Sequence, residues 1–140
     1  MTKNEKDLLL KDLCMRLPYG VKCNVGDDKP YTLNRIEIDD KNGHLLDFIE
    51  TKDGLNMQVY ISEVKPYLFP LDSMTEEQKK EYNHWKHDIP VCHYEYGDVV
   101  EEIELFDSPE SFDYLIENKF DCFGLIPLGL ANDATNLNIY

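Results

Sequence analysis

A chain of 140 residues, 42% of them apolar, has the size and composition of one globular domain. It carries 28 acidic and 14 basic residues and a net charge of −14. Phosphate contacts need Lys and Arg, so neither direct nucleic-acid binding nor docking on acidic membranes is expected. No stretch approaches the roughly 20 apolar residues of a membrane span, and the N-terminus lacks a signal-peptide core, so the expected compartment is the cytoplasm.

The negative charge is concentrated toward the C-terminus. Residues 1–94 carry a net charge of −4, whereas residues 95–140 carry −10 with Lys119 as their one base. The four cysteines form no Cys-x-x-Cys pair, which argues against a zinc knuckle or a redox motif and predicts reduced, mostly buried thiols. They are Cys14, Cys23, Cys92 and Cys122.

The first half of the chain predicts one helix followed by an antiparallel sheet. Leucines recur at helical spacing over residues 4–17, and Pro18 ends that helix. Four strands are expected over residues 21–25, 31–39, 44–50 and 55–62. Asn42-Gly43 and Asp53-Gly54 favour tight hairpins between the later strands. Prolines at positions 66 and 70 predict a packed, extended connector without regular structure over residues 65–70.

The second half predicts two more helices and two more strands. Ser73 or Thr75 caps a central helix whose inner stripe is Gln78, Tyr82, Trp85 and Ile89, and which Pro90 ends. Strands are expected over residues 91–96 and 99–106, and Ser108-Pro109-Glu110 starts a further helix. The predicted fold is α+β: an antiparallel meander of about four to six strands packed with an N-terminal, a central and a C-terminal helix. A single domain over residues 1–140 is expected.

Carboxylates are densest between positions 95 and 121, where their mutual repulsion is relieved by docking a basic surface. An acidic face that only keeps the protein dissolved is the alternative interpretation. The residues predicted to bind a partner are Glu101, Glu102, Glu104, Asp107, Glu110, Asp113, Glu117 and Asp121.

Two other groups of residues resemble metal sites. His84, His87 and Asp88, with Cys92 or His93, offer zinc ligands on one helical turn and just after it, but their spacing matches no established zinc pattern. Asp39, Glu63 and Lys65, with Asp40 and Asp47 nearby, loosely resemble the carboxylate–lysine sets of metal-dependent nucleases. No bound metal or cofactor is predicted, and a metal-dependent hydrolase stays an alternative. A further alternative is a small-molecule binder or structural subunit that uses the aromatic connector at residues 67–69.

Two segments carry a resemblance to known proteins. Met74-Thr75-Glu76-Glu77-Gln78-Lys79-Lys80-Glu81 and residues 112–131, which include Phe120-Asp121-Cys122-Phe123-Gly124, resemble small proteins of phages, prophages and other mobile elements of gut bacteria. That family commonly has Tyr-Arg where this chain has Cys122-Phe123, so no role of the arginine carries over. The resemblance implies an accessory protein that acts inside a bacterial cell.

These observations favour a non-catalytic protein that binds a basic surface of a host or phage protein through its acidic C-terminal half. Binding of this kind serves an inhibitor or a mimic of nucleic acid. The sequence leaves the oligomeric state open.

Overall fold

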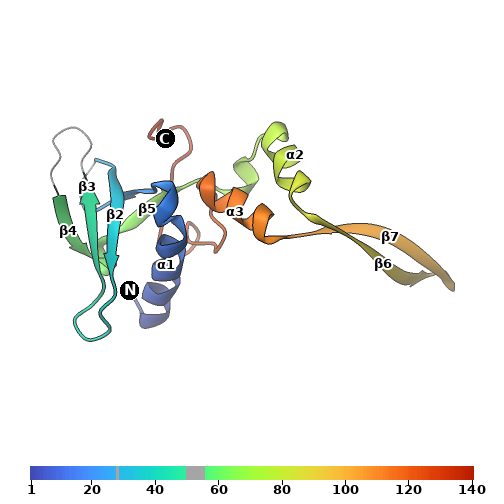
Figure 1. Ribbon diagram of the computed structural model, residues 1–140, viewed down its shortest axis with the longest axis horizontal. Coiled ribbons are helices and arrows are strands. Elements are labelled where there is room, and N and C mark those ends of the chain that lie inside the picture. The colour runs from blue at the N-terminus through green and yellow to red at the C-terminus, as the bar shows by residue number, and fades with distance from the viewer. Residues whose placement is uncertain (28, 50–55) are drawn as a thin grey trace. The chain divides into compact units, whose positions relative to one another are not determined.

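The computed structural model describes residues 1–27, 29–49 and 56–140, which form two compact units. The first unit comprises Met1–Ser73 and Ile116–Tyr140, and the second comprises Met74–Leu115. The predicted α+β class is confirmed (Figure 1). The single domain over residues 1–140 stays a prediction. No helix of the described residues is long and apolar enough to span a membrane.

The first unit begins with helix α1 (Lys3–Arg16), as predicted. Thr2 caps it: the Thr2 hydroxyl accepts from the Glu5 N–H at 3.1 Å, and the Glu5 carboxylate accepts from the Thr2 N–H at 3.2 Å. This reciprocal pair satisfies donors that the first turn leaves free. Leu9 and Leu13 are fully buried and bring α1 onto the hydrophobic core of the sheet.

The sheet of the first unit has six strands in the order β4-β3-β2-β1-β5-β8. Strands β1 (Lys22–Asn24), β2 (Tyr31–Glu37), β3 (Leu45–Ile49) and β4 (Asn56–Tyr60) pair antiparallel in succession, which confirms the meander. The loop between β2 and β3 spans residues 38–44, so the tight hairpin predicted at Asn42-Gly43 is wrong. The second predicted hairpin, at Asp53-Gly54, lies outside the described residues.

Residues 65–70 are packed and extended as predicted, but the expected lack of regular structure is wrong, because they contain strand β5 (Lys65–Leu68). Pro66 stands opposite Cys23 in an antiparallel pair with β1. The extended backbone that proline favours suits a strand, and β5 pairs over only two residues on each side. On its other side β5 pairs parallel with the short β8 (Asn132–Asp133), which adds the C-terminal segment to the sheet.

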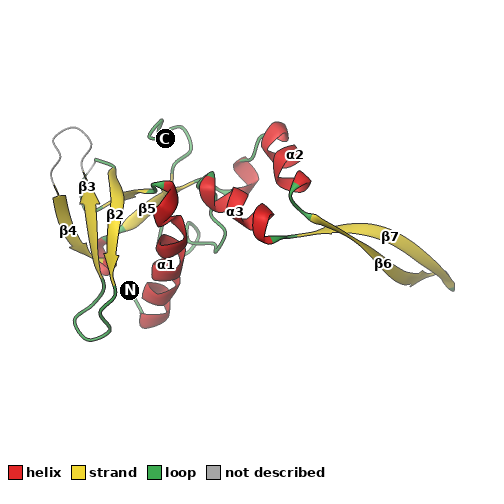
Figure 2. Ribbon diagram, viewed as in Figure 1, coloured by secondary structure: helices red, strands yellow, loops and turns green. Residues whose placement is uncertain are grey.

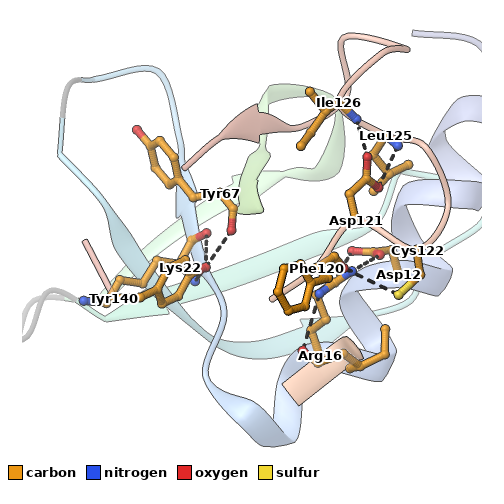
Figure 3. Close-up of polar contacts among 11 residues, drawn as sticks. Asp12, Arg16, Lys22, Tyr67, Phe120, Asp121, Cys122, Leu125, Ile126 and Tyr140 are labelled. Carbon is orange, nitrogen blue, oxygen red and sulfur yellow. Dashed lines mark hydrogen bonds and ion pairs between the residues drawn. The ribbon is translucent and has the colours of Figure 1, made fainter. Parts of the chain in front are cut away.

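A buried ion pair joins α1 to the chain after α3 (Pro109–Glu117). The Arg16 guanidinium donates to both carboxylate oxygens of Asp12, at 2.8 and 2.9 Å, and to the Phe120 carbonyl at 2.6 Å (Figure 3). Asp12 and Arg16 are both fully buried. Burial raises the pKa of Asp12, and the hydrogen bonds from Arg16 partly offset that rise. Because both charges lack water, removing either side chain leaves the other buried without a counter-charge.

The second unit contains helix α2 (Glu76–His84), a hairpin of β6 (His87–Glu95) and β7 (Asp98–Phe106), and the first residues of α3 (Figure 2). Thr75 caps α2 in a second reciprocal pair, with Gln78. The predicted end of this helix at Pro90 is wrong, because α2 ends at His84 and Pro90 lies within β6. Trp85 is 47% exposed instead of belonging to a buried stripe. The side chain of Ile89 lies outside the described part.

Candidate interaction site on the β6–β7 hairpin

Ser108 and Ser111 form the junction between the hairpin and α3. Ser108 was predicted to cap α3, and its hydroxyl accepts from the Ser111 N–H at 3.0 Å. The same hydroxyl donates to the carbonyl of Trp85, the C-cap residue that follows α2. Both serines are buried. These bonds satisfy the free backbone groups at the ends of two helices and hold them beside the base of the hairpin.

Tyrosine side chains add a second set of contacts in this unit. The Tyr82 hydroxyl donates to the Asp107 carboxylate, and the Tyr82 ring stacks on Tyr114 with centroids 6.3 Å apart. The Tyr114 hydroxyl donates to Glu81 at 3.0 Å. Burial, followed by the bond to the Glu81 carboxylate, raises the pKa of Tyr114 to about 12. These contacts connect α2 to α3 and so stabilise the two helices at the base of the hairpin.

The hairpin itself is regular over its whole length. Nine residue pairs, from His87 opposite Phe106 to Glu95 opposite Asp98, join β6 to β7 without a bulge. Tyr96 and Gly97 form the turn with φ values of 51° and 84°. Positive φ at both central residues is the geometry of a type I′ turn, whose twist matches that of the strands it joins.

Most of the predicted acidic residues lie in the second unit. Glu101 and Glu104 are exposed on β7, and Glu110 and Asp113 are exposed on α3. Asp107 is exposed too, but its carboxylate already accepts from Tyr82 and from the Ser111 hydroxyl. The side chain of Glu102 lies outside the described part. We call Glu101, Glu104, Glu110 and Asp113 the acidic set.

The last two predicted residues lie in the first unit. Glu117 is exposed at the end of α3, whereas Asp121 is buried. The two oxygens of Asp121 accept from the N–H groups of Leu125 and Ile126, at 2.8 and 2.9 Å (Figure 3). Asp121 therefore holds the loop that follows it, and its carboxylate does not face solvent.

The suggested zinc ligands are not on one helical turn. His84 ends α2, with its ring 5.2 Å from that of Trp85, whereas His87 and Asp88 begin β6 and point to opposite faces of the strand. His93 lies six residues beyond His87, about 20 Å along an extended strand. No group of three or more His, Cys, Asp and Glu side chains suited to a metal occurs among the described residues.

The nuclease-like residues are also separated by the fold. The Asp39 carboxylate accepts from the N–H groups of Lys41 and Asn42, at 2.9 and 3.1 Å, and these bonds lower its pKa. Asp39 follows the end of β2, whereas Lys65 stands opposite Asn24 on β1, the strand that lies between β5 and β2 and pairs with the start of β2. Glu63 is exposed in a 3₁₀ turn (Ile61–Glu63). The arrangement expected of such a nuclease is therefore not formed by these residues.

The aromatic connector at residues 67–69 belongs to the core of the first unit. Tyr67 and Leu68 are buried, and Phe69 packs on Phe120 with ring centroids 6.2 Å apart. The cysteines are all unpaired, but only Cys23 is buried: Cys122 is half-buried, and Cys14 and Cys92 are exposed. The prediction of mostly buried thiols is therefore wrong.

Exposed apolar side chains on the hairpin are the feature that the sequence analysis missed. Tyr94 is 81% exposed, Tyr96 98%, Val99 63% and Leu105 44%. The alternation that signals a strand gives no sign of whether a second layer covers its apolar face, so only the structure shows that these positions are open. Acidic and apolar groups thus occur together on one hairpin.

The comparisons with known proteins add no further information about this site. No protein-family model, no curated protein and no solved structure matches the chain.

Proposed function

We propose that the chain is a non-catalytic interaction protein whose acidic set binds a basic surface on a host or phage protein. The observation that carries the proposal is the charge of residues 87–115, which contain nine acidic residues and neither Lys nor Arg. The acidic set is exposed on both a strand and a helix of the same unit. Such a field speeds encounter with a cationic partner and repels anionic ones.

The biological setting of the proposal rests on the resemblance of residues 74–81 and 112–131 to mobile-element proteins. In this setting the protein acts in the cytoplasm of a bacterial host, as an inhibitor of a nucleic-acid-binding protein or as a mimic of its substrate. The acidic set then occupies the place of the phosphates. Direct contact with nucleic acid is not part of the proposal, because like charges repel.

The test compares two charge-reversed variants of the full chain. One variant replaces the four residues of the acidic set with Lys. The control replaces Asp7, Glu37, Glu63 and Asp72 with Lys, which gives the same net charge through four exposed acids of the first unit. Both are used to capture partners from the natural host at equal concentration.

The acidic-set variant should lose the captured partner about tenfold or more, whereas the control should keep most of it. Capture should also weaken as salt is raised, because salt screens exposed charges. Equal capture by the two variants would show that net charge alone, and not this surface, governs binding, and the proposal would be abandoned.

A further inference from the structure

The hairpin is a sheet with no third strand among the residues that the structure describes. Each strand is nine residues long, and apolar side chains are exposed on it. A two-stranded ribbon is marginally stable in water unless a further strand or layer joins it. Its outer edges present backbone N–H and C=O groups to any strand that can pair with them.

The turn determines which backbone groups face outward. A two-residue turn is flanked by a hydrogen-bonded pair, here Glu95 and Asp98, and bonded pairs then alternate with unbonded ones along the ladder. The facing residues Tyr94 and Val99 form an unbonded pair, so their N–H and C=O groups point to the outer edges of β6 and β7. Pro90 is also at an unbonded position of β6, where the N–H would point to the outer edge, but proline has no N–H.

The two edges therefore differ. The edge of β6 is interrupted by Pro90, a common means by which proteins block an edge strand. The sequence of β7 contains no proline, so every outward N–H of that strand is retained. The edge of β7 is the better template for another strand.

The faces of β7 also differ in chemistry. Val99 and Leu105 are exposed on one face, beside Tyr94 from β6, and Glu101 is exposed between them on the same face. Asp98 and Glu104 are each adjacent in sequence to one of these residues, so they are exposed on the other face, together with Phe106. A strand added at this edge places one set of alternate side chains beside Val99 and Leu105, with Glu101 as their acidic neighbour. The other set lies beside Asp98 and Glu104, with Phe106 as their apolar neighbour.

We propose that the outer edge of β7 pairs with an extended segment of the partner in which Lys or Arg alternates with apolar residues. The inference rests on the proposed function and specifies its mode: β-strand addition, with backbone bonds for affinity and alternate side chains for specificity. Charge selects this occupant over a second copy of the chain. Residues 87–106 contain six acids and no Lys or Arg, so pairing two hairpins brings like charges together.

The test uses a fluorescent eight-residue peptide in which Lys and Val alternate, and anisotropy at low salt as the measurement. The control peptide has the same composition with four Val followed by four Lys. On the full-length protein, Val99→Pro removes an outward N–H of β7, and Tyr94→Pro makes the same change at the facing position of β6. Neither N–H belongs to the ladder, so both variants should retain the hairpin, as circular dichroism would verify.

The alternating peptide should bind about tenfold or more tightly than the control peptide. Val99→Pro should remove that difference in affinity, whereas Tyr94→Pro should leave it within about twofold. Two further peptides, N-methylated on all Val or on all Lys residues, test the same point without changing the protein. One should lose binding and the other keep it, because only one set of amides faces β7. Equal effects of the two would overturn strand addition.

Lys substitutions in the acidic set separate this inference from the proposed function. If they abolish peptide binding while Val99→Pro and Tyr94→Pro behave alike, the acidic surface stands and strand addition is refuted. If no substitution weakens binding, both ideas are refuted. Light scattering completes the test: a dimer of the unmodified chain that Val99→Pro dissociates would assign the edge to a second copy and overturn the basic occupant.

Discussion

Replacing Arg16 with Met tests how the first unit is held together. The substitution keeps an unbranched apolar stem but removes the guanidinium whose charge faces the Asp12 carboxylate at 2.8 Å. Both side chains are fully buried, so the variant leaves an unpaired carboxylate without water. Breaking a buried ion pair in this way costs about 3–5 kcal/mol of the free energy of unfolding. We expect Arg16→Met to destabilise the first unit by this amount at pH 7.

The loss should depend on pH with a definite sign. Burial already raises the pKa of Asp12, and removing Arg16 takes away the hydrogen bonds that oppose this rise. A carboxyl whose folded pKa is raised favours the folded state at low pH and loses that contribution as pH rises through the folded pKa. The deficit of Arg16→Met should therefore be smaller near pH 4 than at pH 7.

A double-mutant cycle measured by urea unfolding decides whether the pair is coupled. Asp12→Leu alone leaves a buried guanidinium and should be as harmful as Arg16→Met. The double variant should lose only about 1–3 kcal/mol, mainly because the Phe120 carbonyl loses its charged donor. Arg16 also donates to the Ile116 carbonyl at 3.4 Å, but that carbonyl keeps the Lys119 N–H as a donor at 3.1 Å when Arg16 is replaced. Additive losses in the double variant would refute the claim that the two charges depend on each other.

Two further predictions concern single ionisable groups. Tyr114 should ionise near pH 12. The measurement is the phenolate absorbance that the unmodified protein gains at this pH and the Tyr114→Phe variant does not. Because the folded pKa of Tyr114 is raised, its contribution to stability is complete below pH 10 and is lost between about pH 10 and 12. A Tyr114 phenol that ionises at pH 10 would contradict its burial against Glu81. Cys92 is exposed and should react rapidly with a thiol reagent in the folded protein, whereas Cys23 is buried and should react only on unfolding. If the Cys92→Ser variant reacted with the reagent as rapidly and to the same extent as the unmodified protein, this prediction would be contradicted.

Local signals predicted much of the fold because they act over a few residues. Thr75 and Ser108 have hydroxyls that satisfy nearby N–H groups, so both helix starts are visible in the sequence. The end of α2 is different. The spacing of Tyr82 and Trp85 suits a longer helix, but the chain instead pairs His87 with Phe106, nineteen residues away. A contact of that range overrides the local preference and has no local signature.

The candidate site was predictable in its charge but not in its exposure. Glu101 and Asp121 belong to the same run of acids, yet one is exposed on β7 and the other is buried beneath a loop. The difference arises because the N–H groups of Leu125 and Ile126 turn toward Asp121. Composition counts both as negative charge, whereas only the fold decides which carboxylate remains free for a partner.

The acidity of the hairpin also explains how its exposed apolar residues are tolerated. A bare edge beside Val99 and Leu105 would promote association between copies of the chain. Carboxylates such as Glu101 and Glu104 on the same strand oppose that association, because two hairpins would bring like charges into register. The same charges favour a basic strand. A single feature therefore discourages the wrong partner and attracts the right one, which is how specificity arises from a difference of affinities.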